Sequence, residues 1–460
     1  MLVIILLTIC IFGVIIHAHL PENHLTRRYA VKSAYINQAC WLITALAVSL
    51  LVASTPARAA EELTMWSHWP DEVSKRGFVE DRVSEFEASN PQCKVNLQFI
   101  QKAEIYTAAK TSVRTGQAPD IFWLEPDQTE YIDGGYLEPL DSYIDLDNLK
   151  GWAKESWSHG GKVYGLPLEA YTVELYYNKD KLAELGIQVP EGQQLSQEAF
   201  ASLVRKGVDA GITPIGNGVG DRPYPGAYFL QEVLMHKLGL TAYRQLLENK
   251  LSYKDPRVAE IMTWVKGLVD AGAYSKSFMT TKLGESHYYF HTKPGSLTLA
   301  MGSWYTGRSF VPPEKGGQPK DFPLGIMNFP AVEGGVCNNC KTLAVGGSYV
   351  MYSQSKHKQC AGALLKSIAT VDNGNNWMKA VLLQTGIETD PSKIESVHAA
   401  YFQDLKAVNA NAKYFIGTPL HYLQGKCKDA WDQVLNKAFA GGLIGVEEAA
   451  EKMDAACYKG

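Results

Sequence analysis

The sequence predicts an α/β protein with two domains. Strand and helix patterns alternate between residues 62 and 132, which is typical of a parallel sheet with helices on its faces. The length of 460 residues exceeds what one hydrophobic core usually holds. The sequence has no Gly/Ser-rich linker between its halves, so structured strands are expected to join the two domains.

The elements of the first half follow from hydrophobic periodicity. Apolar residues recur at helical spacing before Asn90-Pro91, which stops the helix, and they alternate after it, as in a strand. The elements expected here are strands at 62–66, 94–100 and 120–124 and helices at 70–89, 103–114 and 128–132. Ligands of such sheets lie beyond the carboxyl ends of the strands, so the loops after Trp66 and Leu124 are predicted to carry a site.

The second half is predicted to be mostly helical, with a few short apolar strands. Helical spacing is found at 201–210, 227–238, 242–247, 256–269, 356–368, 374–383, 392–409, 425–439 and 445–456. Strands are expected at 297–301, 326–329 and 343–350.

Residues 1–59 are expected to be a leader that is removed on export. An apolar run at 40–53 follows a positively charged stretch and precedes the small-x-small pattern Ala57-Arg58-Ala59, with cleavage near Ala59-Ala60. Residues 1–30 are interpreted as an upstream extension from a misassigned start. The alternative is a two-helix membrane anchor.

Charge and cysteine usage fit an exported protein. The first 59 residues hold four of the 44 Lys and Arg residues and one of the 48 Asp and Glu residues, so the remainder carries a net charge of −7. No basic face is evident, which argues against nucleic-acid binding. The cysteines after the leader are Cys93, Cys337, Cys340, Cys360, Cys427 and Cys457. An even number in an oxidising compartment predicts disulfides.

Two cysteine pairs permit a more specific expectation. Cys427 and Cys457 lie in two helical patterns near the C-terminus and are predicted to form a bridge. Cys337-Asn-Asn-Cys340 has the spacing of half a zinc site, but no second close pair follows it. A structural disulfide is therefore the preferred interpretation, and no metal or other cofactor is expected.

Several motifs, in their order and spacing, resemble a known family. They are Ala118-Pro-Asp-Ile-Phe-Trp with Gly135-Tyr-Leu-Glu-Pro-Leu-Asp141, Tyr164-Gly-Leu-Pro-Leu with Leu175-Tyr-Tyr-Asn-Lys-Asp180, Leu299-Ala-Met-Gly-Ser-Trp304, and Gly346-Gly-Ser-Tyr-Val. The chain from residue 60 onward resembles the family 1 extracellular solute-binding proteins of carbohydrate ABC transporters, which are maltose-binding-protein-like. The loop around Cys337 and Cys340 departs from many relatives.

This resemblance implies a two-lobed periplasmic-binding-protein fold, with a hinge of crossing strands and a ligand cleft between the lobes. The crossings are expected at 165–170, 295–298 and 369–372. Lobe 1 would then comprise 60–168 and 298–370, and lobe 2 would comprise 169–297 and 371–460. The protein would be a periplasmic monomer without enzymatic activity. It would bind a mono- or oligosaccharide by hinge closure and deliver it to the membrane permease.

Candidate ligand-binding residues combine aromatic rings with polar groups, because sugars stack their C–H faces on rings and their hydroxyls need hydrogen-bond partners. The candidates are Trp66, His68, Trp69, Glu125, Asp127, Glu169, Tyr171, Tyr228, Trp304, Tyr305 and Gly347. Trp304 is expected to be the main stacking ring, and Gly347 to bring backbone amides near the ligand. Helix capping is the alternative for Glu125 and Asp127.

Two other functions remain open at this point. A secreted glycoside hydrolase would need two carboxyl groups facing each other across the scissile bond, and Glu125 and Glu169 are the residues available for that. A two-lobed binder of a polyamine, an organic acid or iron is the other alternative. The adjacent tyrosines Tyr176 and Tyr177 suggest iron as a ligand. Adjacent strand residues point to opposite faces, however, so the two rings are not expected to face one site together.

Overall fold

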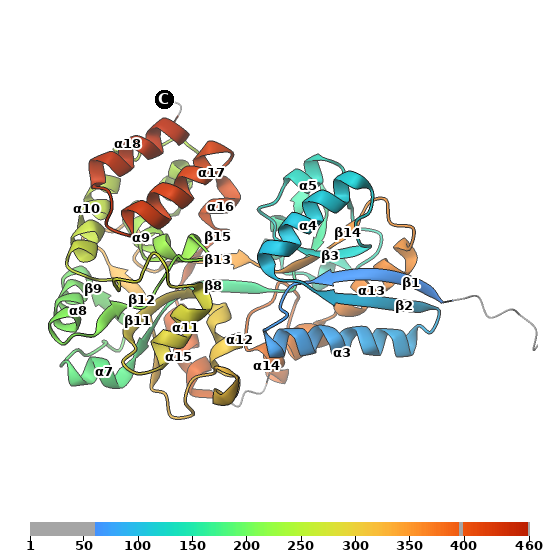
Figure 1. The fold of residues 1–460 in the computed structure, drawn as a ribbon, viewed down its shortest axis with the longest axis horizontal. Coiled ribbons are helices and arrows are strands. Elements are labelled where there is room, and N and C mark those ends of the chain that lie inside the picture. Colours follow the sequence, from blue (N-terminus) through green and yellow to red (C-terminus); the bar gives the residue numbers. More distant parts are fainter. Residues whose placement is uncertain (1–59, 395–398, 459–460) are drawn as a thin grey trace, which may run out of the picture. The chain divides into compact units, whose positions relative to one another are not determined.

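The computed structural model describes residues 60–394 and 399–458. Glu61–Gly460 form one compact unit. Within this unit two separate sheets, each covered by helices, build two lobes (Figure 1). Among the described helices, none is both long enough and apolar enough to cross a membrane. The predicted leader lies outside the described residues.

The first lobe is built on a six-stranded sheet in the order β2-β1-β3-β14-β4, with β7 paired to β14. Its strands are β1 (Glu61–Ser67), β2 (Cys93–Phe99), β3 (Ile121–Leu124), β4 (Leu137–Glu138), β7 (Gly165–Leu166) and β14 (Ser348–Tyr352). β1 runs parallel to β2 and β3, whereas β14 is antiparallel to β3. The predicted alternation is confirmed, because a helix connects each successive pair of parallel strands.

The helices of this lobe bury one face against the sheet. They are α3 (Val73–Ser89), α4 (Lys102–Thr115), α5 (Glu130–Asp133), α6 (Gly151–Ser156), α13 (Lys358–Ile368) and α14 (Val371–Val381), and a hairpin of β5 (Ser158–His159) and β6 (Lys162–Val163) is added to them. α3 buries Phe78, Val79, Val83 and Phe86 as its periodicity predicts. Val73, expected on the same stripe, stands in the first turn and is 49% exposed.

The second lobe is built on a seven-stranded sheet around β8. Its strands are β8 (Ala170–Asn178), β9 (Gln194–Ser196), β10 (Thr213–Ile215), β11 (Ser296–Gly302), β12 (Leu324–Ala331), β13 (Cys340–Val345) and β15 (Lys413–Ile416). β8 pairs antiparallel with β11, β12 and β13, and all nine of its residues are buried. This central position explains its apolar, tyrosine-rich sequence.

Helices surround this sheet and form the whole C-terminal part of the lobe (Figure 1). They are α7 (Lys179–Glu184), α8 (Gln197–Asp209), α9 (Tyr228–Leu247), α10 (Pro256–Asp270), α11 (Leu283–His291), α12 (Thr306–Ser309), α15 (Ala399–Asn409), α16 (Pro419–Tyr422), α17 (Lys426–Ala430), the π-helix η7 (Trp431–Phe439) and α18 (Val446–Cys457). Part of the helix predicted at 392–409 falls on residues 395–398, which lie outside the described residues.

Two crossing segments run side by side between the lobes. The chain passes from β7 to β8 within 165–170, as expected, and it returns at Gly346-Gly347, between β13 and β14. The two segments are hydrogen-bonded to each other. The amide N–H of Glu169 donates to the Gly347 carbonyl, and that of Gly346 donates to the Glu169 carbonyl, both at 2.8 Å.

The expected lobe boundaries need two corrections. The crossing predicted at 295–298 is wrong, because β11 pairs with β8 and β10 inside the second sheet, so 298–345 belong to the second lobe. The crossing predicted at 369–372 is also wrong. α14 packs on α3 in the first lobe, whereas α15 packs on β12 in the second, so the chain changes lobe after residue 381.

The strand predicted at 343–350 is divided between the two sheets. Its first half belongs to β13 and its second half to β14, with Gly346 and Gly347 between them. A Cβ at Gly347 would lie 2.3 Å from the Trp123 indole nitrogen and 2.5 Å from the Trp69 ring. These glycines therefore allow the close approach that the crossing needs, which a continuous strand pattern does not reveal.

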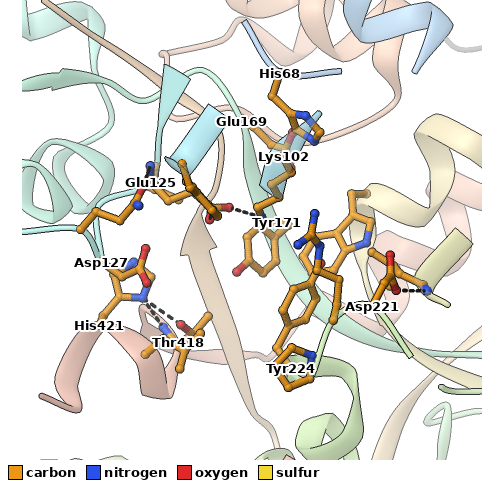
Figure 2. A pocket seen from close by; sticks show the side chains of 18 of the residues that line it. His68, Lys102, Glu125, Asp127, Glu169, Tyr171, Asp221, Tyr224, Thr418 and His421 are labelled. Carbon is orange, nitrogen blue, oxygen red and sulfur yellow. Dashed lines mark hydrogen bonds and ion pairs between the residues drawn. The ribbon is translucent and has the colours of Figure 1, made fainter. Parts of the chain in front are cut away.

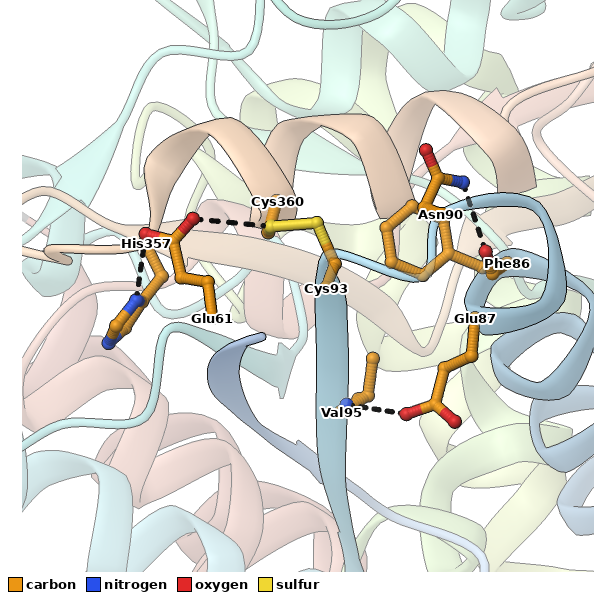
Figure 3. The surroundings of a disulfide bond; sticks show 8 residues. All are labelled: Glu61, Phe86, Glu87, Asn90, Cys93, Val95, His357 and Cys360. Atoms are coloured by element: carbon orange, nitrogen blue, oxygen red, sulfur yellow. Dashed lines mark hydrogen bonds and ion pairs between the residues drawn. A yellow bond between two sulfur atoms is a disulfide. The ribbon is translucent and has the colours of Figure 1, made fainter. Parts of the chain in front are cut away.

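All six cysteines of the described chain are paired. The bridges are Cys93–Cys360, Cys337–Cys340 and Cys427–Cys457, so the predicted C-terminal bridge is confirmed. Cys337 and Cys340, for which the sequence favours a disulfide over a zinc site, pair with each other. Figure 3 shows Cys93, at the start of β2, joined to Cys360 on α13. This bridge ties together segments 267 residues apart within the first lobe. It therefore restricts the unfolded chain over a long loop.

Candidate functional site

A cavity of about 430 Å³ lies between the two lobes. Residues that follow β1 and β3 line it from the first lobe, as expected for the carboxyl ends of parallel strands. The second lobe contributes residues of β8, of α9 and of the segments 221–224, 304–308 and 418–432. Aromatic rings and charged side chains both line the wall (Figure 2).

Four aromatic side chains form the wall on the second lobe. The Trp304 ring lies edge-on to Tyr171, with ring centres 4.4 Å apart, and 6.1 Å from both Tyr224 and Tyr228. Trp304 follows β11 in a 3₁₀ turn, and its ring covers Gly302, where a Cβ would lie 2.1 Å away. The glycine in Met-Gly-Ser-Trp is therefore required for this ring orientation.

The first lobe presents a second group of rings. Trp123 packs edge-on against His68 and Trp69, at 5.1 and 6.3 Å, and lies 5.7 Å from Tyr106. Burial lowers the pKa of His68 to about 3, so this ring is neutral at pH 7 and its Nδ1 lies 3.3 Å from the Ile100 carbonyl oxygen. Aromatic rings thus face the cavity from both lobes.

Lys102, Glu125 and Tyr106 form a polar cluster on the first lobe. The Lys102 ammonium donates to Glu125 at 2.8 Å, and the Tyr106 hydroxyl donates to the other carboxylate oxygen. Lys102 also lies over the rings of Tyr106, Trp123 and Tyr224. Burial alone would lower the pKa of Lys102, but the attraction of Glu125 outweighs burial and raises it. The ammonium is therefore charged and held in place.

A buried ion network lies at a second position on the wall. The Lys75 ammonium is 2.8 Å from Glu169 and 2.9 Å from Glu72, and Arg308 of the second lobe is 3.2 Å from Glu72. Burial acts to raise the pKa of Glu72, but Lys75 and Arg308 together hold it below its ordinary value. Burial raises the pKa of Glu169, which is paired with Lys75 and is also repelled by Glu72. The shared lysine thus neutralises the two carboxylates unequally.

A third polar cluster joins the lobes through Asp127. Its carboxylate is 2.7 Å from the Lys428 ammonium of α17. Burial acts to raise the pKa of Asp127, and the attraction of Lys428 lowers it overall. His421 accepts from the Thr418 amide N–H at 2.9 Å, and burial lowers its pKa, so the ring is neutral at pH 7. Ion pairs therefore link the lobes at two places, Glu72–Arg308 and Asp127–Lys428.

Comparisons with known proteins agree with this architecture. The family described as bacterial extracellular solute-binding protein matches residues 69–375. The chain belongs to this family. The predicted family and the two-lobed fold are thereby confirmed.

Named relatives of this solute-binding protein bind sugars. The multiple sugar-binding protein of Streptococcus mutans serotype c is 26% identical over 296 residues, which span 63% of this chain and 67% of that protein. The maltotriose-binding protein of Pyrococcus abyssi is 36% identical over 94 residues, 20% of this chain and 21% of that protein. Among solved structures, a chitin oligosaccharide binding protein has a TM-score of 0.74 at 19% identity and covers 85% of this chain and 97% of its own. That structural likeness shows the fold.

Eight of the eleven predicted residues line the cavity of the solute-binding protein. They are His68, Trp69, Glu125, Asp127, Glu169, Tyr171, Tyr228 and Trp304. Trp66, Tyr305 and Gly347 do not. Tyr305 is fully buried and packs on Tyr176 and His291, because it turns away from Trp304 on the short 3₁₀ helix. Trp66 lies in β1 and packs on the core, and the Gly347 carbonyl accepts from the Glu169 amide in the hinge.

Several wall residues were not predicted. They include Glu72, Lys75, Lys102, Tyr106, Trp123, Arg308, His421 and Lys428. Lys102 and Tyr106 follow β2, whose carboxyl end meets the same edge of the sheet as β1 and β3, so the strand-end rule could have identified them. For Arg308, His421 and Lys428 the sequence offers no comparable signal, since their position depends on how the second lobe packs.

Proposed function

We propose that this solute-binding protein binds a carbohydrate in the cavity between its lobes and delivers it to an ABC importer. The observation that carries the proposal is the pairing of ring walls from both lobes, Trp69 and Trp123 on one side and Tyr171, Tyr228 and Trp304 on the other. Stacking on both faces suits the C–H surfaces of pyranose rings. Cavities of this size are typical small-molecule sites.

Polar groups on the same wall suit sugar hydroxyls. The indole nitrogens of Trp123 and Trp304 and Nε2 of His421 are buried and have no hydrogen-bond partner within the described residues. Buried polar atoms are usually satisfied, so atoms of this kind at a cavity wall favour a ligand that completes them. The names of the relatives, which include sugar- and maltotriose-binding proteins, support the same ligand class.

The two carboxylates considered for hydrolysis support binding instead. Glu125 is held by Lys102 and Tyr106, and Glu169 by Lys75, so each has a cation within 2.8 Å. Both carboxylates are thus engaged by contacts within the protein, and the named relatives are sugar-binding proteins. We therefore propose a transport role without covalent chemistry.

We propose that the crossing segments act as a hinge that lets the two lobes close on the ligand. A ligand that contacts both ring walls stabilises the closed arrangement, in which Glu72–Arg308 and Asp127–Lys428 also join the lobes. The closed form would be recognised by the membrane permease. We propose that the protein is a periplasmic monomer, exported with cleavage near Ala59-Ala60.

Thermal unfolding of the purified protein against a panel of mono- and oligosaccharides tests this function. A sugar that binds the folded state at a hundred times its dissociation constant should add about 2.7 kcal/mol and raise the midpoint. The same wells are analysed for hydrolysis products. Trp304→Ala should abolish the shift, because it removes the ring at the centre of the second wall.

Each outcome distinguishes one function from another. A midpoint shift with unchanged sugar supports transport. Product formation points to a hydrolase, and a shift with polyamines or organic acids alone points to a non-sugar solute. Retention of the full sugar shift in Trp304→Ala would place the site elsewhere.

A further inference from the structure

A second hollow adjoins the cavity on the outer face of the first lobe. It has a volume of about 530 Å³ and lies between α4 and the segment 128–131. Tyr106, Gln128 and Glu130 line both hollows, so the two are adjacent. The outer hollow, here called the α4 groove, is completed by Thr107, Lys110, Thr111, Arg114, Thr115 and Tyr131.

Each residue that lines the α4 groove carries a polar group on its side chain. Thr107, Thr111 and Thr115 recur every four residues along α4, and each donates its hydroxyl hydrogen to the backbone carbonyl four residues earlier. Their oxygens are left as acceptors. Lys110 and Arg114 are exposed, stand on the same helix and have no ion pair in the part of the chain that the structure describes. They are available as donors.

Tyr131 provides an independent sign of a missing partner. Its side chain is 2% exposed, and its hydroxyl is buried without a hydrogen bond to any described residue. A buried tyrosine hydroxyl usually finds a partner. An external hydrogen-bonding group in the α4 groove, which Tyr131 lines, would complete this hydroxyl.

We propose that the α4 groove is an extension of the binding site that holds the outer units of an oligosaccharide whose first units fill the cavity. This inference rests on the proposed carbohydrate function. It narrows the ligand class to linear oligosaccharides that are long enough to extend out of the closed cleft. The sugar chain would pass from the cavity to the groove beside Tyr106, Gln128 and Glu130, which line both hollows. Acceptors on the threonines and donors on Lys110, Arg114 and Tyr131 match the mixed hydrogen bonding of sugar hydroxyls.

The test is a chain-length series measured by titration calorimetry on protein produced from the full-length sequence. The probes are malto-, xylo- and chito-oligosaccharides from one to seven units. For the series that binds, affinity should rise at the length at which the chain passes Tyr106. Arg114→Gln and Tyr131→Phe should each weaken the longest probe about tenfold and leave the short probes unchanged. Lys366→Gln, at an exposed position on α13 outside both hollows, is the matched control.

The outcomes separate the two proposals. Length-dependent affinity that both groove variants abolish supports the α4 groove. Binding of short sugars without any gain from longer chains, or a gain that survives both variants, overturns the groove and leaves the carbohydrate function standing. Failure of every probe of every length overturns the carbohydrate function, and the groove proposal with it.

Discussion

Replacing Lys75 by methionine should destabilise the protein strongly at pH 8 and only weakly at pH 5. Lys75 is 2% exposed and lies 2.8 Å from Glu169 and 2.9 Å from Glu72. Without it, Glu72 keeps Arg308 at 3.2 Å, but Glu169 becomes a buried carboxylate without a near cation. Breaking a buried ion pair by removing one partner costs about 3–5 kcal/mol.

The pH dependence follows from the orphaned carboxyl group. The pKa of Glu169 is already raised by burial, and loss of Lys75 raises it further. A carboxyl group whose pKa is higher in the folded than in the unfolded state stabilises the fold fully below the unfolded value, and that stability is lost as the pH rises through the folded value. Each unit of pKa shift corresponds to about 1.4 kcal/mol. The deficit of Lys75→Met should therefore shrink by a few kcal/mol between pH 8 and pH 5.

Urea unfolding of the ligand-free protein, followed by tryptophan fluorescence at both pH values, measures this deficit. Lys75→Met/Glu169→Gln should recover most of the stability at pH 8, because it removes the buried charge. Lys94→Met is the matched control, since its partner Glu87 lies 3.4 Å away at the surface and such pairs contribute about 0–1 kcal/mol. A deficit below 1 kcal/mol at pH 8, or the same deficit at both pH values, would refute the reasoning.

Three further predictions concern other parts of the molecule. Burial raises the pKa of Glu232 to about 7, so stability on the order of 3 kcal/mol should be lost as the pH rises from 4.5 to 8. Glu232→Gln should flatten this pH dependence in thermal melts. Parallel curves of stability against pH for the two proteins would contradict this. Replacing Cys427 and Cys457 together by alanine should lower the free energy of unfolding by about 3–4 kcal/mol, because their bridge closes a 30-residue interval. An unchanged unfolding midpoint would contradict this stabilising role of the bridge. Lys428→Gln removes the ion pair with Asp127 across the cavity. Because a partly exposed pair contributes about 1 kcal/mol, this variant should bind sugar about fivefold more weakly when measured by calorimetry. Equal affinity of the variant and the unmodified protein would show that the pair does not aid closure.

Much of the fold could be read from local patterns. The alternation of Val95, Leu97 and Phe99 and the helical stripe through Phe78 and Phe86 correctly predicted the first sheet and its helices, because each element buries one face and the sequence period records that face. The strand-end rule correctly placed His68, Trp69 and Glu125 at the cavity for the same reason.

The lobe boundaries could not be read in this way. An apolar strand such as β11 or β13 has the same pattern whichever sheet it joins, so 298–345 were assigned to the wrong lobe. Gly346-Gly347 resembled a turn within or beside a strand, and only the hydrogen bonds to Glu169 identify it as a crossing segment.

The sequence by itself thus determined the α/β class, the family, the C-terminal disulfide and several of the aromatic residues that line the cavity, because these depend on local periodicity and on motifs that remain intact along the chain. The tertiary structure alone decided which cations neutralise Glu72, Glu169 and Asp127, and it alone placed Arg308 and Lys428 opposite them. The physical reason is that an ion pair depends on distance in space. Apart from the local pair Glu72–Lys75, its partners here lie 94 to 301 residues apart, and no local pattern encodes their approach.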